Sequence, residues 1–174
     1  MTRRRRPGPG RTAAALAALA FFASACDSTP EPKGVLAVER AEDGGVRLLL
    51  AECPGYVAKD FSVLEDTGDG DTVAWSVHNG GWTSSVRDVR LFQAPPEGWR
   101  AADGTLTALR DGVPYVATVN GTSGGRSLRG RVPFTTADLA GLGGGQVLAW
   151  AGGDETMKTD RDGFLHAGPG RCRP

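Results

Sequence analysis

The chain has 174 residues, with 20 basic and 20 acidic side chains, 26 glycines and 11 prolines. Its first 25 residues carry five arginines and no acid, so the remaining 149 residues hold 15 basic and 20 acidic side chains, a net charge of −5. An acidic product without a basic stripe argues against binding to nucleic acid or electrostatic docking to anionic lipid, and its length suits one domain.

The N-terminus has the composition of an export signal. Arginines at 3–6 precede an alanine-rich apolar run over 12–25, which leads directly into Cys26. This order predicts a secretory signal peptide over 1–25, and the run is too short for a stable bilayer span. Its end, Ala23-Ser24-Ala25-Cys26, resembles a bacterial lipoprotein signal. The resemblance implies a lipid on Cys26 and a place on the extracellular face of the cell membrane. Plain secretion after a cut behind Ala25 is the alternative, since that family has a leucine-like residue at the place of Ala23.

The polar, proline-containing stretch that follows predicts a lipidated tether over 26–33, ahead of a single domain over 34–174. With Cys26 assigned to lipid, Cys53 and Cys172 remain as an even pair in an oxidising compartment, which predicts a disulfide. A metal pair is the alternative, but the chain has no CxxC and no nearby histidine cluster. We therefore expect neither metal nor cofactor.

The domain begins with a predicted hairpin, in which strands over 35–40 and 46–51 flank the turn Asp43-Gly44-Gly45. The next strand, over 56–65, has Val57, Phe61 and Val63 at positions expected to share one buried face. The acidic run over 66–71 lacks EF-hand spacing and predicts a turn rather than a calcium site.

Residues 72–78 alternate, with Val73, Trp75 and Val77 expected on one face. One short helix is expected at 136–139. Further strands are expected at 85–92, 105–109, 113–120, 126–135, 146–151 and near 164–165. Short strands between Gly, Asp and Pro turns predict an all-β fold, an antiparallel sandwich or barrel.

Part of this pattern resembles a fibronectin type III or immunoglobulin-like domain. Leu109 stands six residues before Tyr115 with Gly112 between them, as in the tyrosine corner of that family, and Trp75 is similar to its early-strand tryptophan. The resemblance covers about residues 56–137 and implies an antiparallel sandwich, but no activity. The pair Cys53–Cys172 would then tie the N-terminal hairpin to the C-terminus.

The mature chain also resembles uncharacterised secreted lipoproteins of actinobacteria. The residues that carry this resemblance are Cys53-Pro54-Gly55, Pro96-Glu97-Gly98-Trp99, 134–139 and Cys172. It implies no particular activity.

Several residues have the chemistry of catalysis, but each has a simpler interpretation. Gly121-Thr122-Ser123-Gly124-Gly125 matches GxSxG, with Asp138 or Asp154 and then His166 downstream, yet no helix is expected after it and a hairpin turn is favoured. Asp69, Asp71, Asp160 and Asp162 fall in turn-like runs, where aspartate bonds the backbone. His78 and His166 lack metal-ligand spacing.

Two tryptophans, Trp82 and Trp99, lie in loops, where exposed rings would stack on a sugar or anchor a protein. Packing of these rings back onto the sandwich is the alternative. The sequence therefore predicts a cell-envelope lipoprotein of unknown specific role, a non-enzymatic binding or interaction module with an unknown protein or glycan partner. A small secreted hydrolase using Ser123 or an aspartate pair, and a structural envelope protein, are the other hypotheses.

Overall fold

The computed structural model describes residues 31–68, 70–81, 86–166 and 172. Its strands, in chain order, are β1 Leu36–Arg40, β2 Val46–Leu50, β3 Tyr56–Asp66, β4 Asp71–Asn79, β5 Asp88–Arg90, β6 Trp99–Ala101, β7 Tyr115–Ser123, β8 Arg126–Phe134, β9 Gln146–Gly152 and β10 Glu155–Asp160. Two short helices, α1 Thr136–Ala140 and α2 Arg161–Leu165, complete the described elements.

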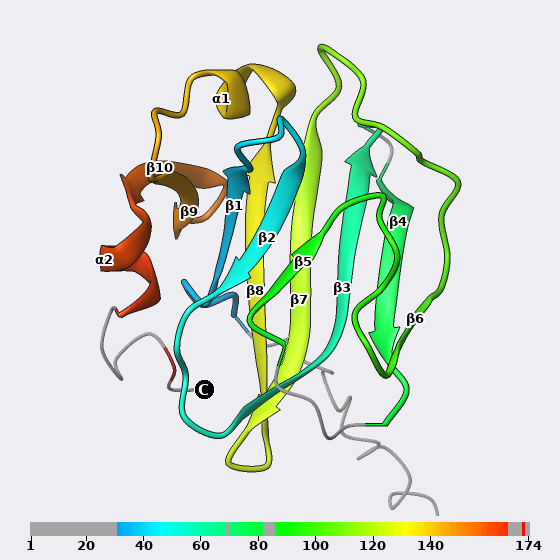
Figure 1. Ribbon diagram of the computed structural model, residues 1–174, viewed down its shortest axis with the longest axis vertical. Helices are drawn as coiled ribbons and strands as arrows, with labels where there is room; N and C mark the ends of the chain where they lie inside the picture. Colours follow the sequence, from blue (N-terminus) through cyan, green and yellow to red (C-terminus); the bar gives the residue numbers. More distant parts are fainter. Residues whose placement is uncertain (1–30, 69, 82–85, 167–171, 173–174) are drawn as a thin grey trace, which may run out of the picture.

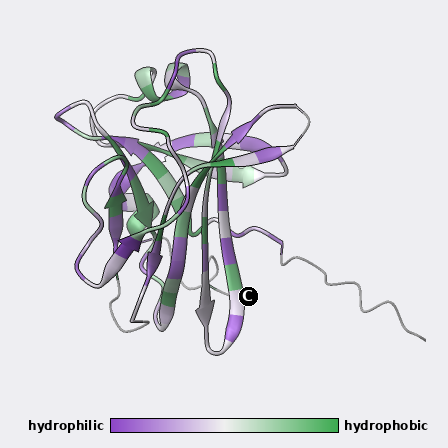
Figure 2. Ribbon diagram, turned by 90° about the vertical axis from the view of Figure 1, so that its right-hand side faces the viewer, coloured by the Kyte–Doolittle hydropathy of each residue, from purple (hydrophilic) through white to green (hydrophobic). Residues whose placement is uncertain are grey.

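The described strands form two antiparallel five-stranded sheets, with the orders β10-β9-β1-β2-β5 and β6-β4-β3-β7-β8 (Figure 1). The predicted all-β sandwich is therefore confirmed. Figure 2 shows hydrophobic and hydrophilic positions alternating along the long strands, as expected where one face of each sheet lies on a core.

The first hairpin forms where it was predicted. Its register runs from Leu36 opposite Leu50 to Arg40 opposite Val46. At the turn, Gly44 has φ +81°, a left-handed conformation that glycine adopts readily, and the Gly45 N–H donates to Asp43 Oδ1 at 3.1 Å.

A bulge in β3 changes which residues face the core. Ala58 pairs with Gly121 and Asp60 with Asn120, so Lys59 is an extra residue in the ladder. An extra residue reverses the alternation of side chains. Tyr56 and Phe61 are therefore both buried although their sequence separation is odd, and the prediction that Val57 shares the face of Phe61 is wrong.

A second bulge lies in β4. Val63 pairs with Trp75 and Leu64 with Val73, which leaves Ala74 as the extra residue. Trp75 and Val77 are buried as predicted, but Val73 lies beyond the bulge and is 42% exposed. The predicted shared face of Val73 and Trp75 is thus wrong, for the same reason as in β3.

Other predictions fail at short elements. The strand expected at 85–92 is shorter than predicted and consists of the three residues of β5. Residues 105–109 form no strand. The strand expected near 164–165 is instead α2, and β6 and β10 were not predicted. The expected helix at 136–139 is confirmed as α1, which Thr135 and Asp138 begin with a reciprocal capping box.

The main core fills the space between the two sheets. Its largest side chains with almost no exposed surface include Leu36, Leu48, Phe61, Tyr115 and Leu128. A smaller apolar cluster lies apart from it and consists of Ala37, Leu49, Ala51, Val147, Ala149 and Phe164. Phe164 belongs to α2 and is completely buried, and the half-buried Leu165 packs against the same cluster, so tertiary packing holds this short helix.

The sandwich has a tyrosine corner, as the resemblance to fibronectin type III and immunoglobulin-like domains implied. The Arg110 N–H donates to the Tyr115 hydroxyl at 3.0 Å, and Tyr115 is 1% exposed at the start of β7. The order β8-β7-β3 matches the G-F-C order of immunoglobulin-like sheets, and β1-β2-β5 matches A-B-E. Trp75 lies in β4, beside the strand in the C position, and so does not take the place of the tryptophan that immunoglobulin domains carry in strand C.

Cys53 and Cys172 form a disulfide with a sequence separation of 119 and Cα atoms 5.3 Å apart. This bond joins the end of the N-terminal hairpin to the C-terminus, as predicted. At the other end of the described chain, the Lys33 N–H donates to the Arg129 carbonyl at 2.8 Å and so fixes the chain against β8.

Candidate functional site

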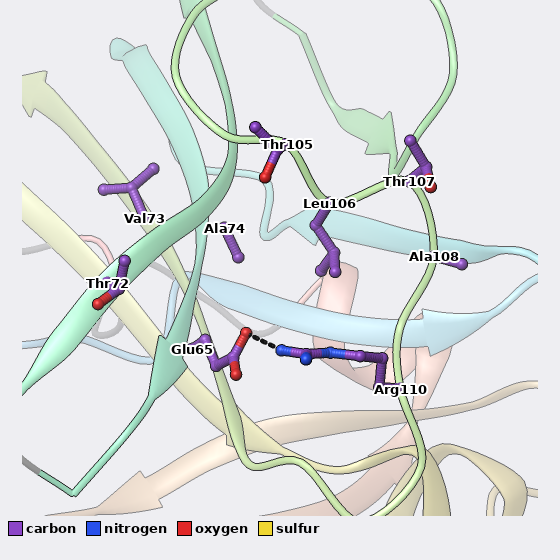
Figure 3. Close-up of a pocket in the computed structure, with 9 residues that line it drawn as sticks. All are labelled: Glu65, Thr72, Val73, Ala74, Thr105, Leu106, Thr107, Ala108 and Arg110. Atoms are coloured by element: carbon purple, nitrogen blue, oxygen red, sulfur yellow. Dashed lines mark hydrogen bonds and ion pairs between the residues drawn. The ribbon is translucent and has the colours of Figure 1, made fainter.

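A groove of about 520 Å³ lies between the first residues of β4 and the segment over 105–110 (Figure 3). Its volume falls in the range of ligand-binding clefts, although it is open to solvent. It is lined by Glu65, Thr72, Val73, Ala74, Thr105, Leu106, Thr107, Ala108 and Arg110.

The bulge at Ala74 closes one end of this groove. Because Ala74 is the extra residue, its carbonyl points to the edge of the sheet and accepts the Leu106 N–H at 3.0 Å. Nearby, Ser76 Oγ donates to the Asp103 carbonyl at 3.0 Å and accepts the Asp103 N–H at 2.9 Å. A Cβ at Gly104, which has φ +110°, would overlap the Ala74 carbonyl, so only glycine lets the two segments approach this closely.

An ion pair closes the other end. Arg110 binds Glu65 through a guanidinium nitrogen, and Figure 3 shows the two side chains extending toward each other from opposite walls. Tyr115 holds the backbone of Arg110, so the tyrosine corner sets the position of this wall. The hydroxyl of Tyr115 and the carboxylate of Glu65 raise the pKa of Arg110 above its ordinary value.

Between these ends, β4 has an open edge. The Thr67 N–H donates to the Gly70 carbonyl across the β3–β4 turn, so the alternation of an antiparallel ladder makes Glu65 and Thr72 the next hydrogen-bonded pair. The backbone groups of Asp71 and Val73 then point away from β3. The neighbouring strand β6 covers only Val77–Asn79, and in the described part of the chain nothing pairs with these two residues on that side.

Trp99, one of the two tryptophans predicted as binding residues, does not line this groove. Trp99 is 6% exposed and lies 5.4 Å from Phe61 between ring centroids, so it is a core side chain and does not meet the condition of an exposed ring. Its position at the start of β6 turns it onto the sandwich. Trp82 lies outside the described residues, as do Cys26 and the predicted signal over 1–25.

The residues of the hydrolase hypothesis each have another structural role. Ser123 pairs with Arg126 across the two-residue turn Gly124-Gly125, so the GxSxG match is a β-hairpin. Asp138 caps α1, Asp154 binds Arg131, and the ring of His166 contacts the Asp162 carbonyl at 2.9 Å. These contacts bring no acid or histidine to Ser123.

The remaining candidates are also distributed over separate turns and strand ends. Asp160 accepts the Gly163 N–H at 2.8 Å as the cap of α2, and Asp71 begins β4, whereas Asp69 is outside the described residues. His78 is exposed on β4. Within the described ranges, no three His, Cys, Asp or Glu side chains are grouped as metal ligands.

Comparisons with known proteins give no relative. No family model, no curated protein and no solved structure matches this chain. In the part of the chain that the structure describes, neither helix has the length and apolar composition to cross a membrane.

The groove was not predicted from the sequence, although two of its determinants carry signals there. The resemblance of residues 109–115 to a tyrosine corner implied the contact that positions Arg110. Gly104 marks the close approach of the loop to β4. The bulge at Ala74 had no signal, because the apparent alternation of residues 72–78 continues through it.

Proposed function

We propose that this protein is a non-enzymatic binding module of the cell envelope, anchored by a lipid on Cys26, which takes its partner in the groove between β4 and residues 105–110. The observation that carries the proposal is the groove itself. It combines the unpaired edge backbone of β4 with three threonines, Thr72, Thr105 and Thr107, and the exposed apolar side chain of Val73 lies on the other face of the same edge. Apolar surface beside convergent polar groups is the usual composition of a binding site.

The predicted anchor suits such a role. Cys26 lies seven residues before Lys33, which is fixed against β8, so at full extension the chain between them spans roughly 25 Å. A domain on this tether stays near the membrane surface. A partner in the same layer meets the groove at a raised local concentration.

Site-specific photo-crosslinking in intact cells tests this function. A photo-reactive phenylalanine analogue replaces Val73, at the open edge beside the groove, or, as a control, Met157 on β10 of the other sheet. The two positions are a matched pair, since their native side chains are 42% and 48% exposed and both lie on strands at or near a sheet edge.

We expect one dominant crosslinked product from position 73 that position 157 does not give, to be identified by mass spectrometry. The same set of products from both positions would contradict the proposed function. It would leave the structural envelope protein as the better hypothesis.

A further inference from the structure

We propose that the groove binds a cationic, extended peptide segment of a partner protein, which adds to the open edge of β4 as an extra strand. This inference rests on the proposed function and names the chemistry of its partner. Three features of the described residues carry it: the unpaired backbone, the shape of the groove, and its charge.

The backbone of the edge is the first feature. Leu106 already pairs with the outward carbonyl of Ala74, so at this residue the chain itself supplies the partner on that side of β4. Val73 and Asp71, the next residues with outward N–H and C=O groups, have no such partner in the described chain. An unpaired strand edge is a template for another strand, and main-chain hydrogen bonds supply much of the affinity in strand addition.

The position of the side chains agrees with an added strand. Thr72 points to the same face as its neighbour Glu65, toward the wall formed by residues 105–108, and Val73 points to the opposite face. A partner residue opposite Thr72 would therefore place its side chain in the groove. The residues before and after it would lie beside the exposed Val73. An alternating peptide with small β-branched side chains fits both environments.

The charge of the groove indicates a cationic partner. Glu65, Asp66 and Asp71 surround this end of β4, and Arg110 is the one basic side chain that pairs with any of them in the described chain. Asp71 is exposed, and its carboxylate has no hydrogen-bond or ion-pair partner among the described residues. Lysine or arginine flanking the added strand would lie close to these carboxylates, and such contacts weaken as salt is raised.

The test uses a defined probe, the fluorescein-labelled peptide Lys-Val-Thr-Val-Thr-Val-Lys with blocked ends, and the protein from residue 27 onward. Fluorescence anisotropy should show saturable binding at low salt. A second peptide with both lysines replaced by glutamate should bind at least about tenfold more weakly. A third, methylated on alternate backbone nitrogens, should lose binding because it cannot form the ladder.

Variants of Val73 provide the matched control on the protein side. Val73→Pro removes the outward N–H at an edge where proline is tolerated, and should weaken binding at least about tenfold. Val73→Thr keeps both the N–H and the branched shape, and should stay within about threefold of the parent protein. If Val73→Pro fails to fold, the methylated peptide makes the same test on the parent protein.

Equal binding of the methylated and unmethylated peptides, or no binding of the parent protein, would overturn strand addition. Equal binding of the lysine and glutamate peptides would overturn the cationic partner. A crosslink specific to position 73 in cells would leave the proposed function standing in these cases, whereas its absence would remove that function as well.

Discussion

Gly130 lies on the inner side of β8 at a point where the core leaves no room for a side chain. A Cβ there would lie 2.7 Å from Leu36 Cβ and 2.9 Å from Val119 Cγ1. Real Cβ atoms do not approach other atoms so closely, so one of the sheets would have to shift. Leu36 belongs to the first sheet and Val119 to the second, so the two sheets are in close contact at Gly130.

We expect Gly130→Ala to lower the free energy of unfolding by about 1 to 3 kcal/mol, the usual cost of adding volume to a filled core. Chemical denaturation of both proteins measures this difference in the free energy of unfolding. Gly144→Ala is the control, because Gly144 is exposed with nothing within 4 Å of its Cβ position, and should change stability by less than about 0.5 kcal/mol. Equal stability of the two variants would contradict the close contact between the sheets.

Tyr56 gives a prediction on pH dependence. Burial, and then the nearby negative charge of Asp60, raise the pKa of the Tyr56 hydroxyl above its ordinary value, and the hydroxyl donates to the Leu128 carbonyl at 3.3 Å. Above about pH 10 the unfolded chain ionises this tyrosine while the folded protein keeps it neutral. Stability is therefore fully present below pH 10 and declines as the pH rises toward the folded pKa.

Urea denaturation at pH 9 and pH 11 measures the free energy of unfolding of the parent protein and of Tyr56→Phe. The parent should lose more stability over this interval than the variant, by at most about 1.4 kcal/mol for each pH unit above 10. The variant lacks only the hydroxyl, so changes in other groups cancel. Parallel pH profiles would show that Tyr56 ionises as readily in the folded protein as in the unfolded chain.

At the level of elements, sequence pattern predicted the long strands and failed at the bulges and short elements. The hairpin of β1 and β2 and the strand β8 follow directly from β-prone runs and glycine turns. The bulges at Lys59 and Ala74 reverse the alternation, and no residue type marks them. The five-residue helix α2 depends on burial of Phe164, a tertiary contact that local sequence does not contain.

The candidate site was missed for the same reason. The groove exists because the Ala74 carbonyl leaves the β3 ladder and accepts Leu106, and this arrangement depends on the register between distant segments. The disulfide, in contrast, was predictable from the number of cysteines. The chain has three, and two remain to pair once Cys26 is assigned to lipid. Trp99 shows that local composition does not predict whether a side chain is buried. It follows a proline-rich, loop-like sequence, yet it is part of the core.

The disulfide between Cys53 and Cys172 gives a prediction about the thermal stability of the domain. Closing a loop of more than a hundred residues contributes about 4 to 5 kcal/mol in the chain-entropy model. We expect reduction, or Cys53→Ser with Cys172→Ser, to lower the melting temperature by about 8 °C or more. Calorimetry with and without reductant measures the change. An unchanged melting curve, with two thiols titrating in the oxidised sample, would contradict the bond.

At the scale of the whole molecule, the proposed lipid on Cys26 gives a prediction about the location of the protein. Fractionation of cells that express the full-length chain should find the parent protein with the membrane, and Cys26→Ser released from it, because two or more acyl chains anchor firmly and a serine accepts none. Ser24→Ala is the control, since it keeps a small residue before the cut, and should remain with the membrane. Release of the parent protein itself would support plain secretion.

The disulfide also makes most of the domain a closed ring. Every strand from β3 to β10 lies between Cys53 and Cys172 in the sequence, and so does the groove wall over 105–110. A protease that cuts this exposed wall once therefore releases no fragment, since both new ends stay joined through the two sulfurs. The nicked protein would run as one band on a denaturing gel until it is reduced, and the cut domain would stay in one piece.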